Sequence, residues 1–131
     1  MTAKSLLVVD DNPENLKLIL MILASSGYEL VTASDANQAL LAIECHIPDL
    51  ILLDLQLPGM DGLELTRRLK ANAETTNIPI VAVTAYAMKG DEAKARHAGC
   101  DGYLVKPVDK RLLREVVKQM LSSVDSAEPS A

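Results

Sequence analysis

Short apolar runs alternate five times with longer segments of helical periodicity, and this alternation constrains the fold more than any other feature of the sequence. The run that ends at Asp54 is wholly apolar before its carboxylate, which is typical of a strand buried on both faces. The expected strands cover residues 5–9, 28–32, 50–54, 80–84 and 103–105. The expected helices cover residues 13–26, 35–46, from 61 or 62 to about 72, 88–98 and 109–122.

Alternation with short connections predicts right-handed βαβ units on a parallel sheet that is covered by helices on both faces. Five strands fit the order 2-1-3-4-5 of the flavodoxin-like α/β fold, a three-layer arrangement with five helices. The length of 131 residues suits one domain, which we expect to cover residues 1–122. Residues 123–131 are small and polar, so we expect a disordered tail there.

Acidic residues outnumber basic ones by eighteen to thirteen, and the net charge of −5 argues against nucleic acid or an anionic membrane as a partner. No apolar run is long enough to span a bilayer, and the N-terminus lacks a signal-peptide pattern, so a cytoplasmic location is expected. Cys45 and Cys100 lie far apart and match no metal or redox spacing, so we expect both to be buried thiols.

Polar side chains stand at the carboxyl ends of four expected strands. They are Asp10 and Asp11 after the first, Asp54 on the third, Thr84 on the fourth and Lys106 after the fifth. In the order 2-1-3-4-5 these four strands are neighbours, and their carboxyl ends meet at the edge where open α/β sheets bind ligands. We therefore expect three carboxylates, one hydroxyl and one ammonium in a single crevice.

Carboxylates brought this close together repel one another, so a bound cation is expected to neutralise them. Oxygen ligands without His or Cys favour Mg²⁺, with Mn²⁺ as an alternative. Such an ion leaves coordination sites for phosphate oxygens, and a carboxylate can attack phosphorus to give an aspartyl phosphate. Asp54 is the best-placed nucleophile because it lies on the central strand, while Thr84 and Lys106 can contact a phosphate.

Four motifs, in this order, resemble those of the receiver domains of two-component response regulators, the CheY-like superfamily. They are VVDDN at 8–12, LLDLQLPGMDG at 52–62, VTA at 83–85 and GYLVKP at 102–107. The resemblance extends over about residues 4–121 and implies the CheY-like form of the flavodoxin-like fold. Within the family, residues 81–92 and 99–100 look most like those of DivK-type single-domain regulators.

The resemblance implies roles for the acidic residues of the crevice. Asp54 would be the phosphoacceptor, and it would also contact the metal. Asp11 would bind Mg²⁺ directly, and Asp10 would bind it mainly through water. Gln56 would contribute its backbone carbonyl to the metal, while its side chain and that of Tyr86 would set the rate of hydrolysis.

The resemblance also implies a switch around the phosphoryl group. Thr84 and Lys106 would hold the phosphoryl oxygens, and Tyr103 would turn inward when Thr84 moves toward the phosphate. The bond between Lys106 and Pro107 would be a cis peptide, since X–Pro bonds adopt this form most readily.

The first helix carries more apolar residues than one buried face requires. The apolar residues at positions 16, 19, 20 and 23 have the i, i+3, i+4, i+7 spacing of one helix face, and we expect this face to contact the sheet. Three further apolar residues fall on the opposite side of the helix: Leu18, Met21 and Ile22. They either pack against a neighbouring helix or the tail, or form a docking surface for the four-helix bundle of a phosphodonor.

These features together predict a free-standing phosphorylation switch. A histidine kinase or a histidine phosphotransfer protein would phosphorylate Asp54, and a downstream protein would bind the fourth helix, fifth strand and fifth helix. The chain would catalyse only its own phosphorylation and slow dephosphorylation, as a monomer or weak dimer.

Three alternatives stay open. A Mg²⁺-dependent phosphohydrolase with an aspartate nucleophile would need a second acid at the position of Gln56. A flavodoxin-like FMN binder would place the flavin phosphate near Asp10 and Asp11, which would repel it. The chain could also be a receiver domain excised from a hybrid histidine kinase or a longer regulator.

Overall fold

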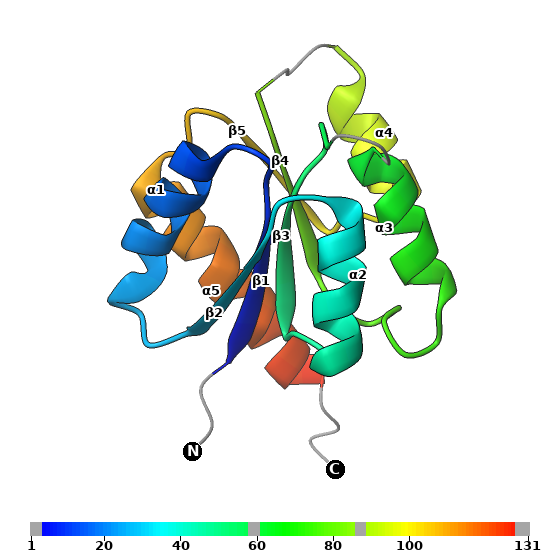
Figure 1. Ribbon diagram of the computed structural model, residues 1–131, viewed down its shortest axis with the longest axis horizontal. Coiled ribbons are helices and arrows are strands. Elements are labelled where there is room, and N and C mark those ends of the chain that lie inside the picture. The colour runs from blue at the N-terminus through cyan, green and yellow to red at the C-terminus, as the bar shows by residue number, and fades with distance from the viewer. Residues whose placement is uncertain (1–3, 58–60, 86–88, 128–131) are drawn as a thin grey trace.

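The computed structural model describes residues 4–57, 61–85 and 89–127, and these form a parallel sheet between two layers of helices (Figure 1). The strands are β1 (Ser5–Val9), β2 (Glu29–Ala33), β3 (Leu50–Asp54), β4 (Ile80–Thr84) and β5 (Gly102–Val105). The helices are α1 (Pro13–Ala24), α2 (Ala36–Cys45), α3 (Gly62–Ala71), α4 (Asp91–Ala98) and α5 (Lys110–Ala127). Every pairing is parallel and the order is β2-β1-β3-β4-β5, as the sequence predicts.

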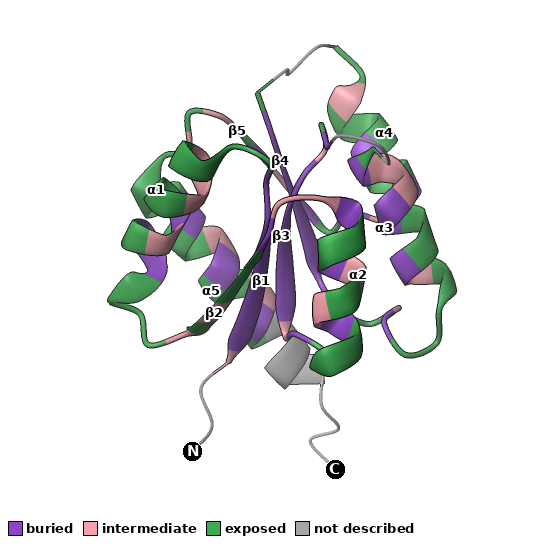
Figure 2. Cartoon of the chain, viewed as in Figure 1, coloured by how far each residue is buried: buried purple, intermediate pink, exposed green. Residues whose placement is uncertain are grey.

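Successive side chains of the central strands point to opposite faces of the sheet and bury two separate apolar clusters. Ile51 and Leu53 of β3 pack with residues of α2, α3 and α4. Leu50 and Leu52 of the same strand pack with α1 and α5. Figure 2 shows the central strands buried along their length, because helices cover both faces of a sheet of this kind.

Polar caps set the starts of α1 and α3, two of the helices that leave the carboxyl edge of the sheet. The Asn12 side chain accepts hydrogen bonds from the amides of Glu14 and Asn15, and Pro13 occupies the first helical position of α1. Asp61 caps α3 by accepting from the Glu64 amide at 2.8 Å. These caps bring the start of each helix directly next to the strand end that precedes it.

Helix α5 extends further than the sequence suggested. We expected it to end at Ser122, where a disordered tail would begin, yet it continues to Ala127. Small residues such as Ser and Ala do not end a helix by themselves, so the composition after Ser122 was a poor guide to the helix end. The predicted disorder of the final residues stays a prediction, because 128–131 lie outside the described residues.

The two thiols lie in different environments. Cys100 is buried as expected, whereas Cys45, in the last turn of α2, is exposed, so the prediction for Cys45 was wrong. The buried face of α2 consists of Ala36, Ala39 and Ile43, and Cys45 lies off that face.

Across the described ranges, none of the helices combines the length and the apolar character that crossing a bilayer requires.

Candidate functional site

Four strand ends bring the predicted polar residues together at one edge of the sheet. Asp10 directly follows β1, and its amide donates a hydrogen bond to the carbonyl of Ala33, the last residue of β2, at 3.0 Å. Asp54 and Thr84 are the last residues of β3 and β4, and both are buried. Lys106 follows β5, and its amide donates to the carbonyl of Thr84 at 2.8 Å.

The ammonium of Lys106 lies between two buried carboxylates. Its Nζ atom is 2.8 Å from Asp10 Oδ2 and 3.1 Å from Asp54 Oδ2, and these two acidic side chains are only 1% and 6% exposed. Burial alone would lower the pKa of Lys106, but its two carboxylate partners outweigh that effect and raise the pKa. Burial raises the pKa of Asp54, and the Gln56 amide and the Lys106 ammonium offset this only in part.

Backbone amides orient the other oxygen of each buried carboxylate. Asn12 donates its amide to Asp10 Oδ1 at 2.9 Å, and Gln56 donates its amide to Asp54 Oδ1 at 2.9 Å. Both bonds span two residues, so each aspartate organises the turn that directly follows its own strand. Each carboxylate is therefore held in one orientation before any ligand binds.

The acidic residues fit a hard divalent cation. Asp10, Asp11 and Asp54 offer carboxylate oxygens that all lie within 4.8 Å of one another. Among the described residues, Asp10 Oδ2 accepts no hydrogen bond of regular geometry, although it is buried and the Lys106 ammonium is near. A buried oxygen with unused lone pairs in an all-oxygen donor set suits Mg²⁺. The predicted contribution of the Gln56 carbonyl stays a prediction.

Gly62 allows the first turn of α3 to lie directly against the end of β3. The Gly62 amide donates to the carbonyl of Leu55 at 3.0 Å. A Cβ atom at this position would lie 2.7 Å from the Asp54 carbonyl oxygen and 2.5 Å from Leu55 Cα. Since these are backbone atoms that cannot rotate away, any larger residue would displace the loop that follows Asp54.

A cavity of about 230 Å³ adjoins the site on the side of α4. Gln56 and Thr84 line this cavity, together with the charged residues Asp61, Asp91 and Lys94. No functional role for these three charged residues could be predicted from the sequence, because isolated charges in helices and at helix starts are ordinary features of a solvated surface. Tyr86, which we expected to flank the site, lies outside the described residues.

Two further predicted residues have clear positions. The peptide bond between Lys106 and Pro107 is cis, which confirms the prediction. Tyr103 is half-buried and packs against the cluster formed with α2, α3 and α4. Its hydroxyl oxygen is buried and has no hydrogen-bond partner within the described part of the chain. Burial raises the pKa of Tyr103, and the nearby acidic residues Asp91 and Glu92 raise it further.

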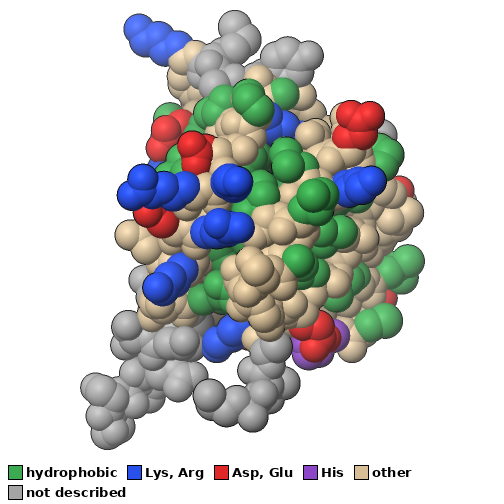
Figure 3. Space-filling view, turned by 90° about the vertical axis from the view of Figure 1, so that its left-hand side faces the viewer, with side chains coloured by type: hydrophobic (Ala, Val, Ile, Leu, Met, Phe, Trp, Pro, Cys, Tyr) green, Lys and Arg blue, Asp and Glu red, His purple; other side chains and the backbone are tan. Residues whose placement is uncertain are grey.

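The outer face of α1 agrees only in part with the prediction. Leu18 and Met21 are 42% and 67% exposed, but Ile22 is buried with 5% exposure, so its assignment to an exposed docking surface was wrong. Ile22 packs in the cluster between the sheet and α5, and its carbonyl accepts a hydrogen bond from Arg114 Nε at 3.2 Å. Figure 3 shows this side of the molecule, where hydrophobic side chains lie beside a group of basic ones.

The fold, the acidic cluster and the lysine that follows β5 together define a receiver domain. The chain matches the response regulator receiver domain family over residues 6–118 and belongs to this family. It is a two-component receiver of the phosphorylation-based signalling type.

Individual relatives make the likeness more specific. The chain is 44% identical to the polar-differentiation response regulator DivK of Brucella ovis, over 90% of this chain and 96% of that protein. A CheY-like receiver domain protein from Methanospirillum hungatei superimposes with a TM-score of 0.88 at 33% identity, over 95% of this chain and 98% of its own.

A third relative adds information about the metal. The receiver domain of a sensor histidine kinase from Pseudomonas aeruginosa has a TM-score of 0.84 at 34% identity, over 92% of this chain and 99% of its own. That structure contains a magnesium ion coordinated in its active-site cleft. The present chain has an acidic cluster of its own at the carboxyl edge of the sheet, formed by Asp10, Asp11 and Asp54.

Proposed function

We propose that Asp54 accepts a phosphoryl group from a phosphohistidine in a Mg²⁺-dependent reaction, and that this modification switches the binding of a protein partner. The observation that carries the proposal is the position of Asp54. It is a buried carboxylate at the end of the central strand, ion-paired to Lys106 and adjacent to two further acids. A carboxylate in these surroundings is oriented and desolvated, as an aspartate nucleophile needs to be.

Transfer forms a bond between an Asp54 oxygen and phosphorus and breaks the bond between phosphorus and the histidine nitrogen. The electron pair of the broken bond leaves with the imidazole. Lys106 already lies 3.1 Å from Asp54, so its charge can stabilise the phosphoryl oxygens without a large movement. The Thr84 hydroxyl, at the end of the neighbouring strand, is a second donor for the product phosphate.

Asp10, Asp11 and Asp54 would hold Mg²⁺, or alternatively Mn²⁺, together with the backbone carbonyl of Gln56. The bound ion neutralises the carboxylates and the incoming phosphate oxygens. The amides of Asn12 and Gln56 support this arrangement, because they fix the orientation of the carboxylates of Asp10 and Asp54. The side chain of Gln56 is exposed and lines the adjoining cavity, which supports a role in setting the rate of slow self-dephosphorylation.

Phosphorylation would act on partner binding through Thr84 and Tyr103. The Thr84 hydroxyl would turn to the phosphate, and the Tyr103 ring would move further into the space beside it. The output surface is then formed by α4, β5 and α5, where Val105 and Leu112 are 43% and 47% exposed. These exposed apolar side chains border one cavity with Tyr103, and this proximity supports a link between the proposed sensor and the proposed partner surface.

The phosphodonor would dock on the exposed part of α1. Leu18 and Met21 provide apolar contact area, and the helix begins immediately after the acidic pair. A histidine kinase or a histidine phosphotransfer protein presents its histidine from a four-helix bundle, and this bundle could pack against α1. The proposed complex is between monomers, with a separate downstream protein as the target of the phosphorylated form.

The chemistry can be tested by locating the phosphoryl group. After incubation with acetyl phosphate and Mg²⁺, hydroxylamine should convert an aspartyl phosphate into a hydroxamate, which peptide mass spectrometry can assign to a residue. We expect the hydroxamate at Asp54 and none at Asp49, a partly buried carboxylate that accepts the Ser5 amide at 2.7 Å and serves as the internal control. A hydroxamate at any residue other than Asp54 would overturn the proposal.

A further inference from the structure

The two halves of helix α4 differ in how much of their surface is buried. Its buried residues, Ala95 and Ala98, both lie in the C-terminal half. In the first turn Glu92 is exposed, and the helix starts after Gly90, which has a φ of 92° and offers no side-chain cap. The N-terminal half of α4, which borders the cavity next to Thr84, is therefore the more weakly packed half.

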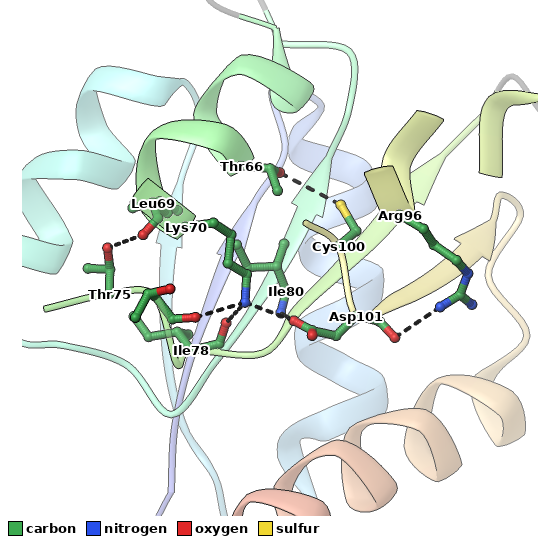
Figure 4. A network of polar contacts seen from close by, with 10 residues as sticks. Thr66, Leu69, Lys70, Thr75, Ile78, Ile80, Arg96, Cys100 and Asp101 are labelled. Atoms are coloured by element: carbon green, nitrogen blue, oxygen red, sulfur yellow. Dashed lines mark hydrogen bonds and ion pairs between the residues drawn. The ribbon is translucent and has the colours of Figure 1, made fainter. Parts of the chain in front are cut away.

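A lysine of α3 lies beside the C-terminal end of α4. Lys70, in the last turn of α3, donates from Nζ to the carbonyls of Ile78 at 2.8 Å and Thr76 at 3.2 Å (Figure 4). The same ammonium contacts Asp101 Oδ2 at 3.0 Å. These three acceptors match the three donors of a lysine ammonium, so its hydrogen-bonding capacity is fully used.

Asp101 connects this lysine to three parts of the fold. Its Oδ2 atom accepts from the Ile80 amide at 2.9 Å, and its own amide donates to the Ile80 carbonyl at 2.7 Å, which ties it to the first residue of β4. Its carbonyl accepts from Arg96 Nη1 at 3.3 Å, which ties it to the last turn of α4. Asp101 also directly precedes β5. The side chain and the backbone of Asp101 together thus join the amino ends of β4 and β5 to the last turn of α4.

The aliphatic part of Lys70 adds a packing contact to these polar ones. Gly99, which follows α4 with a φ of 122°, lies directly beneath this side chain: a Cβ atom there would be 2.6 Å from Lys70 Cγ. The amide of Gly99 closes the helix by donating to the carbonyls of Ala95 and Arg96. The end of α4 is thereby held by its own backbone, by Lys70 and by Asp101.

We propose that Lys70 is the fixed point about which α4 tilts when Asp54 is phosphorylated, so that the N-terminal half of the helix moves and its C-terminal end stays in place. The proposal rests on the proposed function. The hydrogen bonds of Lys70 lie near the amino ends of β4 and β5, whereas Thr84 lies at the carboxyl end of β4 beside the phosphorylation site. A structural change at the phosphorylation site would therefore act first on the weakly packed N-terminal half of α4. The contacts of Lys70 would keep the C-terminal end in place, so the movement would be confined to the N-terminal half.

Residue-resolved amide hydrogen exchange by NMR tests this proposal on the full chain, with and without acetyl phosphate and Mg²⁺. In the native protein, phosphorylation should change exchange at residues 92–95 and leave exchange at Gly99, Cys100 and Asp101 unchanged. Lys70→Met keeps the packing on Gly99 but removes the ammonium. In this variant the change on phosphorylation should extend to those three amides, which should exchange about tenfold faster or more in the phosphorylated than in the unphosphorylated variant.

Two further variants distinguish an anchor from a general loss of stability. Asp101→Asn keeps an acceptor for the Ile80 amide but loses the ion pair, so it should behave like Lys70→Met. Lys118→Met, at an exposed position of α5, should behave like the native protein. Intact mass should show full phosphorylation of each variant, which separates a failure of this proposal from a failure of the proposed function. An unchanged exchange pattern in Lys70→Met, or a native response as large at Gly99 as at residues 92–95, would overturn the proposal.

Discussion

The Nζ atom of Lys106 lies 3.1 Å from the Oδ2 atom of Asp54, a residue 52 positions earlier in the chain. The same ammonium is 2.8 Å from Asp10 Oδ2. One positive charge therefore pairs with two buried carboxylates, one just after β1 and the other at the end of β3. Their proximity depends on this lysine or on a bound cation, because like charges in a buried crevice repel strongly.

Replacing this lysine should therefore destabilise the protein most when no metal is present. In EDTA, Lys106→Met should lose about 3 kcal/mol of unfolding free energy, because the variant leaves two buried carboxylates without their partner. Added Mg²⁺ should restore part of that loss. Urea denaturation with and without Mg²⁺ measures both effects, with the exposed-site variant Lys118→Met as control. Equal stability of Lys106→Met and the native protein in EDTA would contradict this account.

The raised pKa of Asp54 predicts a specific pH dependence without metal. The folded protein keeps the Asp54 proton to a higher pH than the unfolded chain does, so its unfolding free energy should fall as pH rises from the unfolded-state pKa, about 3.9, through the folded-state pKa. Asp54→Asn has no such proton. The stability of the native protein relative to this variant, measured by urea unfolding in EDTA, should therefore decline over that interval. A constant difference between the two proteins would count against a raised pKa.

Truncation of the two neighbouring residues Met21 and Ile22 should change stability by very different amounts. Ile22→Ala should cost about 2–4 kcal/mol, because it opens a cavity between the sheet and α5. Met21→Ala should change stability by less than about 0.5 kcal/mol, since Met21 is 67% exposed. Thermal and urea unfolding of both variants measure the contrast. Similar costs at the two positions would mean that the α1 and α5 packing described here is wrong.

The proposed docking surface on α1 predicts a partner-specific defect. Leu18→Glu combined with Met21→Glu should slow phosphotransfer from a phosphorylated histidine phosphotransfer protein by about tenfold or more, because it places charges in an apolar contact. Phosphorylation by acetyl phosphate should remain unchanged, as this small donor needs no docking surface. Leu41→Glu, at a residue of α2 that is 61% exposed, is the matched control. Equal slowing with both donors would indicate damage to the site and would remove the docking hypothesis.

Much of this arrangement could be predicted from the sequence because it depends on local patterns. Apolar runs identify the strands, and the short connections identify the parallel order that the structure confirms. The strand order then places Asp10, Asp54 and Lys106 at one edge, which is where the structure has them. Such predictions succeed because a strand end fixes the location of a side chain before any packing detail is known.

Features that depend on how separate elements pack were not predictable in the same way. The periodicity of α1 alone placed Ile22 opposite the sheet, because it carries no information about where α5 lies against α1. The contacts at the end of α4 include an ion pair between Lys70 and Asp101. These residues are 31 positions apart and belong to no recognisable sequence pattern. The sequence predicted that Lys106, Asp10 and Asp54 share one crevice, but not that the lysine pairs with both carboxylates. Those ion pairs depend on the side-chain conformations, which the sequence pattern does not give.

The central claim, that Asp54 is the Mg²⁺-dependent phosphoacceptor, is tested most directly by intact mass. The native chain and Asp54→Asn are incubated with acetyl phosphate, each with Mg²⁺ and with EDTA. The account predicts that the native chain gains the mass of one phosphoryl group in Mg²⁺ only, and that Asp54→Asn gains none in either condition. A native chain that stays unmodified in Mg²⁺, or a variant that is modified as fully as the native chain, would contradict it.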